Sequence, residues 1–121
     1  MAVYVKFETP KEVSDNAYAV AEIVRDSGKL KKGTNEVTKV VERGDAKIVI
    51  MAADVEPPEI LAHMPALCDE RGVPYVYVPS KVELGKAIGL EKPTASIAVV
   101  EIGNAAEKIA EIANAVKDLK N

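Results

Sequence analysis

The apolar residues of this chain follow a helical period in some segments and form short continuous runs in others. The helical period predicts a helix from about residue 11 to Ser27, a second from Gly33 to Arg43, and an amphipathic helix over 104–119. The inward faces of the first and last helices are expected to be Val13, Ala17, Val20, Ala21 and Val24, and Ile109, Ile112, Ala113 and Val116. A further helical region follows Pro57-Pro58, where Pro65 is expected to break or restart the helix, and a short helix covers 81–87.

Short continuous apolar runs predict the strands. They cover 47–53, 73–78 and 95–102, and Leu30 with its lysine neighbours adds a short strand. The run 47–53 is apolar at nearly every position, so it is predicted to be a central strand that is covered on both faces. Helices that alternate with such strands indicate an α/β fold, with helices on both faces of a small sheet, and we expect a single domain over 1–121.

Composition narrows the class of protein. The chain has 121 residues, 48% of them hydrophobic and 29% charged, which suits an ordinary globular domain. A single cysteine, Cys68, allows no internal disulfide, and no apolar run approaches the roughly 20 residues of a membrane span, so a cytoplasmic location is expected. Cys68 with the single histidine, His63, is too little for a metal site. Both are predicted to lie on one helix, His63 as a structural residue and Cys68 as a small buried one.

The charge of the chain is unevenly distributed. The net charge is −3, which argues mildly against a nucleic-acid partner. Residues 29–43, however, hold five basic and two acidic side chains, a local charge of +3, so the remainder carries −6. A compact nucleic-acid footprint and an ordinary solvated surface both fit this local basic patch.

The helix predicted from Gly33 carries polar side chains opposite its apolar ones. At 100° per residue, three valines at positions 37, 40 and 41 face the core, and Asn35, Glu36, Lys39 and Arg43 share the opposite face. An amide, a carboxylate and an ammonium can read the polar edges of a ligand, and the free N–H groups of a helix start attract an anion. Favourable helix-end charge and a Glu36–Lys39 pair would also explain part of this face. On these residues alone, both interpretations stay open.

Other candidate sites carry weaker signals. Asp54 and Ser80-Lys81 follow apolar strands, where ligands of α/β sheets bind, so a small signalling or ligand-binding domain that uses Asp54 and Lys81 is an alternative. Asp54 is more simply explained as a loop or capping residue. The glycines form no nucleotide-binding fingerprint, and five aromatic residues without tryptophan are too few for a base-stacking platform.

Three segments of the chain resemble the kink-turn-binding ribosomal protein family. They are Gly33-Thr34-Asn35-Glu36-Val37-Thr38-Lys39, Ile50-Met51-Ala52-Ala53-Asp54-Val55-Glu56-Pro57, and Val73-Pro74-Tyr75-Val76-Tyr77-Val78, the last followed by Ser80-Lys81 and Leu84-Gly85. The Gly-Thr-Asn-Glu-x-Thr-Lys block is the specific part of the similarity. The similarity extends in order over nearly the whole chain and is strongest to archaeal large-subunit members.

The resemblance implies a three-layer α–β–α sandwich with a small, mostly four-stranded mixed sheet. It implies a non-catalytic scaffold without cofactors that binds kink-turns and kink-loops, which are RNA bends built on tandem sheared G·A pairs. The side chains of Asn35, Glu36 and Lys39 would contact those guanines, and Glu56, Ile60 and Lys81 would flank a nucleotide flipped out at the bend. The full set of implied RNA-binding residues is Lys32, Gly33, Thr34, Asn35, Glu36, Lys39, Arg43, Glu56, Ile60, Lys81, Leu90, Glu91, Lys92 and Ala95.

The loop over 90–95 departs from some relatives. Leu90, Lys92 and Ala95 stand where those relatives have valine, arginine and isoleucine, and Glu91 brings a negative charge close to the RNA. The resemblance further implies service in the large ribosomal subunit, in box C/D and H/ACA guide particles and in ribonuclease P. The partners would be those RNAs and the proteins that dock on the complex, with the free chain a monomer. A sibling confined to the ribosome is the close alternative.

Overall fold

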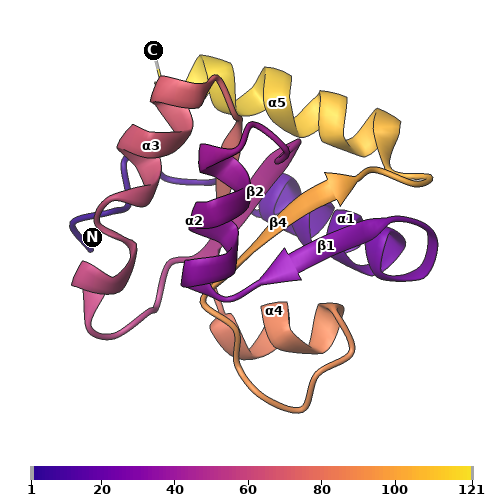
Figure 1. Cartoon of the computed structure of the whole chain (residues 1–121), viewed down its shortest axis with the longest axis horizontal. Helices are drawn as coiled ribbons and strands as arrows, with labels where there is room; N and C mark the ends of the chain where they lie inside the picture. Colours follow the sequence, from indigo (N-terminus) through magenta and orange to yellow (C-terminus); the bar gives the residue numbers. More distant parts are fainter. Residues whose placement is uncertain (1, 121) are drawn as a thin grey trace.

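A mixed four-stranded sheet forms the centre of the computed structural model, which describes residues 2–120 (Figure 1). The strands are β1 (Lys29–Lys32), β2 (Ile48–Ala52), β3 (Tyr75–Val78) and β4 (Ser96–Glu101), in the order β1-β4-β2-β3. The central strand β2 pairs in parallel with β3 and antiparallel with β4, and β4 pairs antiparallel with β1. All five residues of β2 are buried, which confirms the prediction of a central strand covered on both faces.

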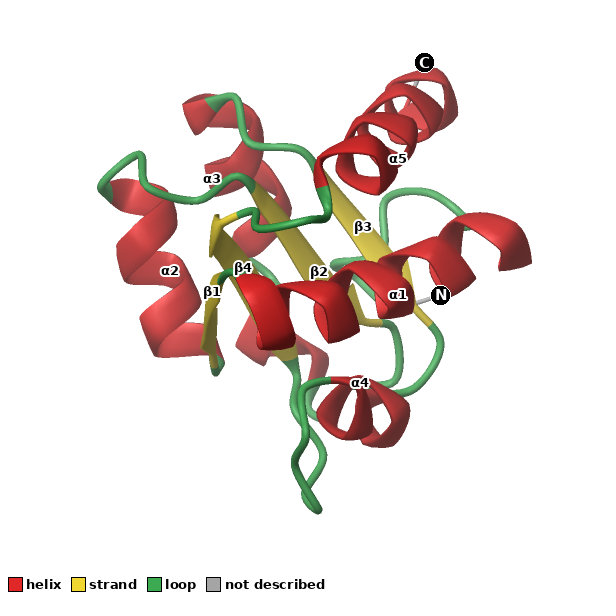
Figure 2. Ribbon diagram, turned by 90° about the vertical axis from the view of Figure 1, so that its right-hand side faces the viewer, coloured by secondary structure: helices red, strands yellow, loops and turns green. Residues whose placement is uncertain are grey.

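Helices cover both faces of this sheet, as predicted. In Figure 2, α2 (Thr34–Glu42) and α3 (Met64–Arg71) lie on one side, whereas α1 (Lys11–Ser27) and α5 (Ala106–Lys120) lie on the other. The short helix α4 (Lys81–Ala87) lies at one end of the sheet. The arrangement is the predicted three-layer sandwich. None of the helices in the described chain combines the length and the apolar composition that a membrane span requires.

The predicted inward faces of the helices are largely correct. All five apolar positions expected on α1 are buried, as are the three valines of α2. On α5, Ile112 and Val116 are buried, but Ala113 and Ile109 are only half-buried. The core that these faces share contains Tyr4, Tyr77, Ile50, Met51, Leu84 and Ile97, all 2% exposed or less.

The segment after Pro57 is helical and restarts near Pro65, as predicted, but a turn interrupts it. It forms a short 3₁₀ helix, η1 (Pro58–Leu61), a turn, and then α3, in whose first turn Pro65 lies. Proline is tolerated there because the first helical N–H groups have no partner within the helix. The placement of His63 on a helix was therefore wrong: it lies in the turn and is exposed. Cys68 lies on α3 and is fully buried, as predicted.

The strand directions bring four distant chain segments to one edge of the sheet. Because β2 and β3 are parallel, both end there, and Ala52 pairs with Val78. Because β4 is antiparallel to β2, and β1 to β4, that edge also holds the start of β4 and the end of β1, where Lys32 pairs with Ile97. We call this edge, with the segments 32–36, 53–60, 79–81 and 90–95 that leave or enter it, the site edge.

Candidate nucleic-acid interface

The turn between β1 and α2 begins the site edge. Gly33 has φ +86° and ψ 142°, a conformation that a residue with a side chain rarely adopts. Its N–H donates to the Ser96 carbonyl at 3.1 Å, which joins the start of α2 to the start of β4. A Cβ atom at this position would meet nothing within 4 Å, so the backbone faces open space. Since glycine has no side chain to cap α2, the N–H groups of the first turn can donate to an approaching anion.

The predicted polar face of α2 is exposed at its N-terminal half. Asn35, Glu36 and Lys39 are all solvent-accessible. The Lys39 Nζ lies 3.5 Å from the Glu36 Oε1, with side chains 57% and 52% exposed. A solvated pair of this kind contributes only about 0.5 kcal/mol, so a ligand can separate the two charges at small cost.

A hydrogen bond joins α2 to the turn before α3. The Thr38 hydroxyl donates to the Thr34 carbonyl at 2.7 Å, so its hydrogen is already used. The His63 Nε2 lies 2.9 Å from the same oxygen and is therefore the donor of that bond. The contact joins positions 25 residues apart, so the sequence offered no signal for it.

The loop over 90–95 packs closely on α4. Gly85 approaches it so closely that a Cβ atom would lie 2.0 Å from the Lys92 carbonyl oxygen. The Leu90 N–H donates to the Gly85 carbonyl at 2.9 Å, and the Thr94 N–H donates to the Lys81 carbonyl at 3.0 Å. One more hydrogen bond, from the Ala52 N–H to the Ala95 carbonyl at 2.9 Å, ties the loop to β2. Its tip exposes Glu91 and Lys92 while Leu90 and Ala95 are half-buried.

The loop after β2 and the following η1 present a second group of exposed side chains. Glu56 is exposed, and Ile60 is unusual for an apolar side chain in being 41% exposed. The Asp54 Oδ1 accepts a hydrogen bond of 2.9 Å from the backbone N–H of Lys81, the first residue of α4. This is the loop or capping role predicted for Asp54, and it engages the carboxylate that the signalling alternative would use.

Two tyrosine hydroxyls, those of the buried Tyr4 and the half-buried Tyr18, bond to these loops, and the sequence did not single them out. Tyr4 bonds to the loop after β2 and Tyr18 to the loop after β3. Burial raises the pKa of both hydroxyls above the ordinary value, and hydrogen bonds from Val55 and Ser80 oppose that increase. Both therefore stay protonated at neutral pH and can donate.

The structure brings all but two of the predicted site residues into the segments of the site edge, and one of the two, Lys39, lies one turn further along α2 beside Glu36. The other, Arg43, follows the last turn of α2, about 12 Å along the helix axis from Asn35. Exposed carboxylates, lysines and an amide alternate along the edge, so it offers donors and acceptors rather than a uniform positive field. Within residues 2–120, no three His, Cys, Asp or Glu side chains are grouped closely enough to ligate a metal.

Comparison with known proteins identifies the class. Residues 15–109 match the ribosomal protein L7Ae/L30e/S12e/Gadd45 family, and the chain belongs to that family. This confirms the family that the sequence resemblance predicted.

A solved structure has the same fold over its full length. It is the Giardia lamblia 15.5kD RNA binding protein, 34% identical in sequence, with a TM-score of 0.90. The match covers 98% of this chain and 98% of that one. The α/β sandwich predicted for this chain is therefore also the fold of a protein described as RNA-binding.

Proposed function

We propose that this chain is a non-catalytic RNA-binding scaffold that recognises kink-turns and kink-loops through the site edge. The observation that carries the proposal is an exposed carboxylate, Glu36, held among helix-start N–H groups and lysines. A negative charge weakens attraction to phosphates, so affinity alone does not account for it. It does suit the reading of guanine, whose N–H groups donate to a carboxylate while its O6 and N7 accept from an ammonium.

The remaining residues fit the other parts of a kinked RNA. Lys32 and the open backbone at Gly33 can meet phosphates, and Asn35 and Lys39 can contact base edges beside Glu36. A bend exposes such edges, whereas the major groove of a regular A-form helix is too narrow for side chains. Glu56, Lys81 and the exposed Ile60 supply charged groups and an apolar surface for an unpaired nucleotide.

The proposal is tested by measuring the affinity for two RNAs. One is a kink-turn, and the other is a duplex of equal length without G·A pairs. Glu36→Gln removes the charge and places an NH₂ donor where guanine also donates. We expect binding to the kink-turn to weaken by about 1–3 kcal/mol, roughly 5- to 150-fold. Binding to the plain duplex should stay unchanged or strengthen, because a repulsive charge has been removed.

The Glu83–Lys86 pair of α4 provides a matched control. It has the same i,i+3 spacing, a distance of 3.6 Å and side chains 58% and 65% exposed, and it borders Tyr18 and Glu22 of α1. Glu83→Gln should leave both affinities within about twofold. Equal wild-type affinity for the two RNAs, or tighter kink-turn binding by Glu36→Gln, would contradict guanine recognition.

The particles in which the scaffold acts are part of the same proposal. We propose the large ribosomal subunit, box C/D and H/ACA guide particles and ribonuclease P, because each would need a fixed RNA bend on which other proteins dock. Purification of the tagged chain followed by sequencing of the bound RNA distinguishes this from a ribosome-only role. Recovery of ribosomal RNA alone would restrict the proposal to the ribosome.

A further inference from the structure

Two tyrosines each bond twice to a loop of the site edge. The Tyr4 hydroxyl donates to the Ala52 carbonyl at 2.6 Å and accepts from the Val55 N–H at 3.1 Å, across the turn that begins the 53–60 segment. The Tyr18 hydroxyl, on α1, donates to the Ser80 carbonyl at 3.3 Å and accepts from the Ser80 N–H at 3.1 Å. Each hydroxyl thus bonds to one backbone donor and one backbone acceptor, and the Ser80 carbonyl also accepts from the Leu84 N–H at 3.0 Å.

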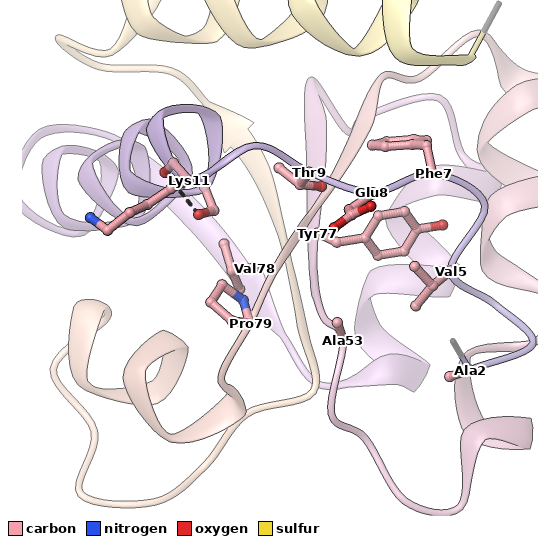
Figure 3. Close-up of a pocket in the computed structure, with 11 residues that line it drawn as sticks. Ala2, Val5, Phe7, Glu8, Thr9, Lys11, Ala53, Tyr77, Val78 and Pro79 are labelled. Atoms are coloured by element: carbon pink, nitrogen blue, oxygen red, sulfur yellow. Dashed lines mark hydrogen bonds between the residues drawn. The ribbon is translucent and has the colours of Figure 1, made fainter.

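Asp54 connects the two loops. Its Oδ1 accepts from the Lys81 N–H at 2.9 Å, while the Ser80 hydroxyl accepts from the Glu83 N–H at 3.1 Å and caps α4. On the side facing α1, Ala53 and Pro79 both line a pocket of about 550 Å³. Figure 3 shows these two residues apart, with the pocket between them. The relative position of the two loops is therefore set both by the Asp54–Lys81 bond and by the backbone bond from the Ala53 N–H to the Val78 carbonyl at 2.8 Å.

We propose that Tyr4, Asp54 and Tyr18 form a clamp that holds Glu56 and Lys81 in place to receive an unpaired nucleotide of the bound RNA. The inference rests on the proposed function and concerns positioning residues, since no hydroxyl of the clamp needs to touch the RNA. Glu56 lies one residue after Val55, and Lys81 one residue after Ser80, so each clamped residue directly precedes a side chain of the site. A loop that is ordered before binding does not lose its conformational freedom on binding, and this increases affinity.

Two matched RNAs distinguish a role in nucleotide binding from a general effect on protein stability. One is a kink-turn with its unpaired nucleotide, and the other carries a propyl spacer in place of that nucleotide. Tyr4→Phe, Tyr18→Phe and Asp54→Ala should each weaken binding to the first RNA by about 5- to 20-fold and to the second by less than about twofold. Asp54→Asn keeps an acceptor oxygen and should recover most of the loss seen with Asp54→Ala.

Tyr75→Phe is the matched control. Tyr75 is a buried tyrosine at the opposite end of β3, and it belongs to neither loop. It should bind both RNAs as the wild type does. Urea unfolding verifies that every variant is folded at the assay temperature. Equal losses on the two RNAs for the clamp variants, or the same pattern for Tyr75→Phe, would overturn the clamp.

Amide hydrogen exchange in the free protein tests the connection without RNA. The Tyr4 hydroxyl bonds only to the Ala52–Val55 turn, and Asp54 in that turn accepts the hydrogen bond from the Lys81 N–H, so Tyr4→Phe should weaken that bond. We expect exchange of that N–H to accelerate by about tenfold or more in Tyr4→Phe and to be unchanged in Tyr75→Phe. An unchanged Lys81 rate in Tyr4→Phe would overturn the clamp even if kink-turn binding is found. If the wild type shows no preference for the kink-turn, the proposed function itself fails, and with it the role of the clamp in RNA binding.

Discussion

Replacing Gly85 by alanine tests how closely α4 and the 90–95 loop depend on each other. Gly85 lies inside α4, where alanine is intrinsically better than glycine by about 1 kcal/mol. Helix propensity therefore predicts a more stable protein. The structure predicts the opposite, because the new Cβ would lie 2.0 Å from the Lys92 carbonyl oxygen and 3.1 Å from its carbon.

The size of the effect follows from these distances. A carbon and a carbonyl oxygen approach no closer than about 3.3 Å without repulsion, so α4 or the loop must move by more than about 1 Å. Forcing a methyl group into a packed site costs about 1–3 kcal/mol. The displacement also strains the Leu90–Gly85 and Thr94–Lys81 hydrogen bonds, each worth about 1 kcal/mol. After the gain in helix propensity, we expect a net loss of about 2 kcal/mol in the free energy of unfolding.

Urea unfolding and RNA affinity together decide the outcome. Gly85→Ala should lower the urea midpoint and should also weaken kink-turn binding, because Lys92 and Leu90 are displaced with the loop. Lys86→Ala, an exposed substitution in the same helix, should change stability by less than about 0.5 kcal/mol. A Gly85→Ala protein that is more stable by about 1 kcal/mol and binds normally would refute the reasoning.

Two further predictions concern glycine conformation and alkaline pH. Gly33→Ala and Gly44→Ala, at φ +86° and +80° with nothing within 4 Å of either Cβ, should each lower stability by about 1–2 kcal/mol in urea unfolding. Only Gly33→Ala should weaken RNA binding in a gel shift, and equal binding losses would contradict the placement of the site at the start of α2. Burial raises the pKa of the Cys68 thiol to about 12, so the folded chain holds a proton that the unfolded chain loses above about pH 9. Stability should therefore fall by up to about 1.4 kcal/mol per pH unit above pH 9, and Cys68→Ala should fall less steeply; identical slopes would exclude this thiol as a cause.

Local patterns were sufficient to predict most elements. The three valines of α2 recur at helical spacing, and this alone predicted that Asn35, Glu36 and Lys39 are exposed on the other side. The helical period is a property of neighbouring residues, so it can be recognised without knowing which elements pack against the helix. The segment after Pro57 was harder, because a four-residue 3₁₀ helix and a turn have no period to read. His63 was misplaced on a helix for the same reason.

The sequence by itself determined most of the helices and strands, most of the faces that they bury, and the block of residues that carries the family similarity. Tertiary structure decided that β1, β2, β3 and β4 bring their loops to one edge, since strand order and direction depend on pairings between distant residues. It also decided the supports of that edge: the two tyrosine hydroxyls, the Asp54–Lys81 bond and the close approach at Gly85. These contacts join positions many residues apart and depend on the interatomic distances of the folded chain. No local pattern of residue types encodes those distances.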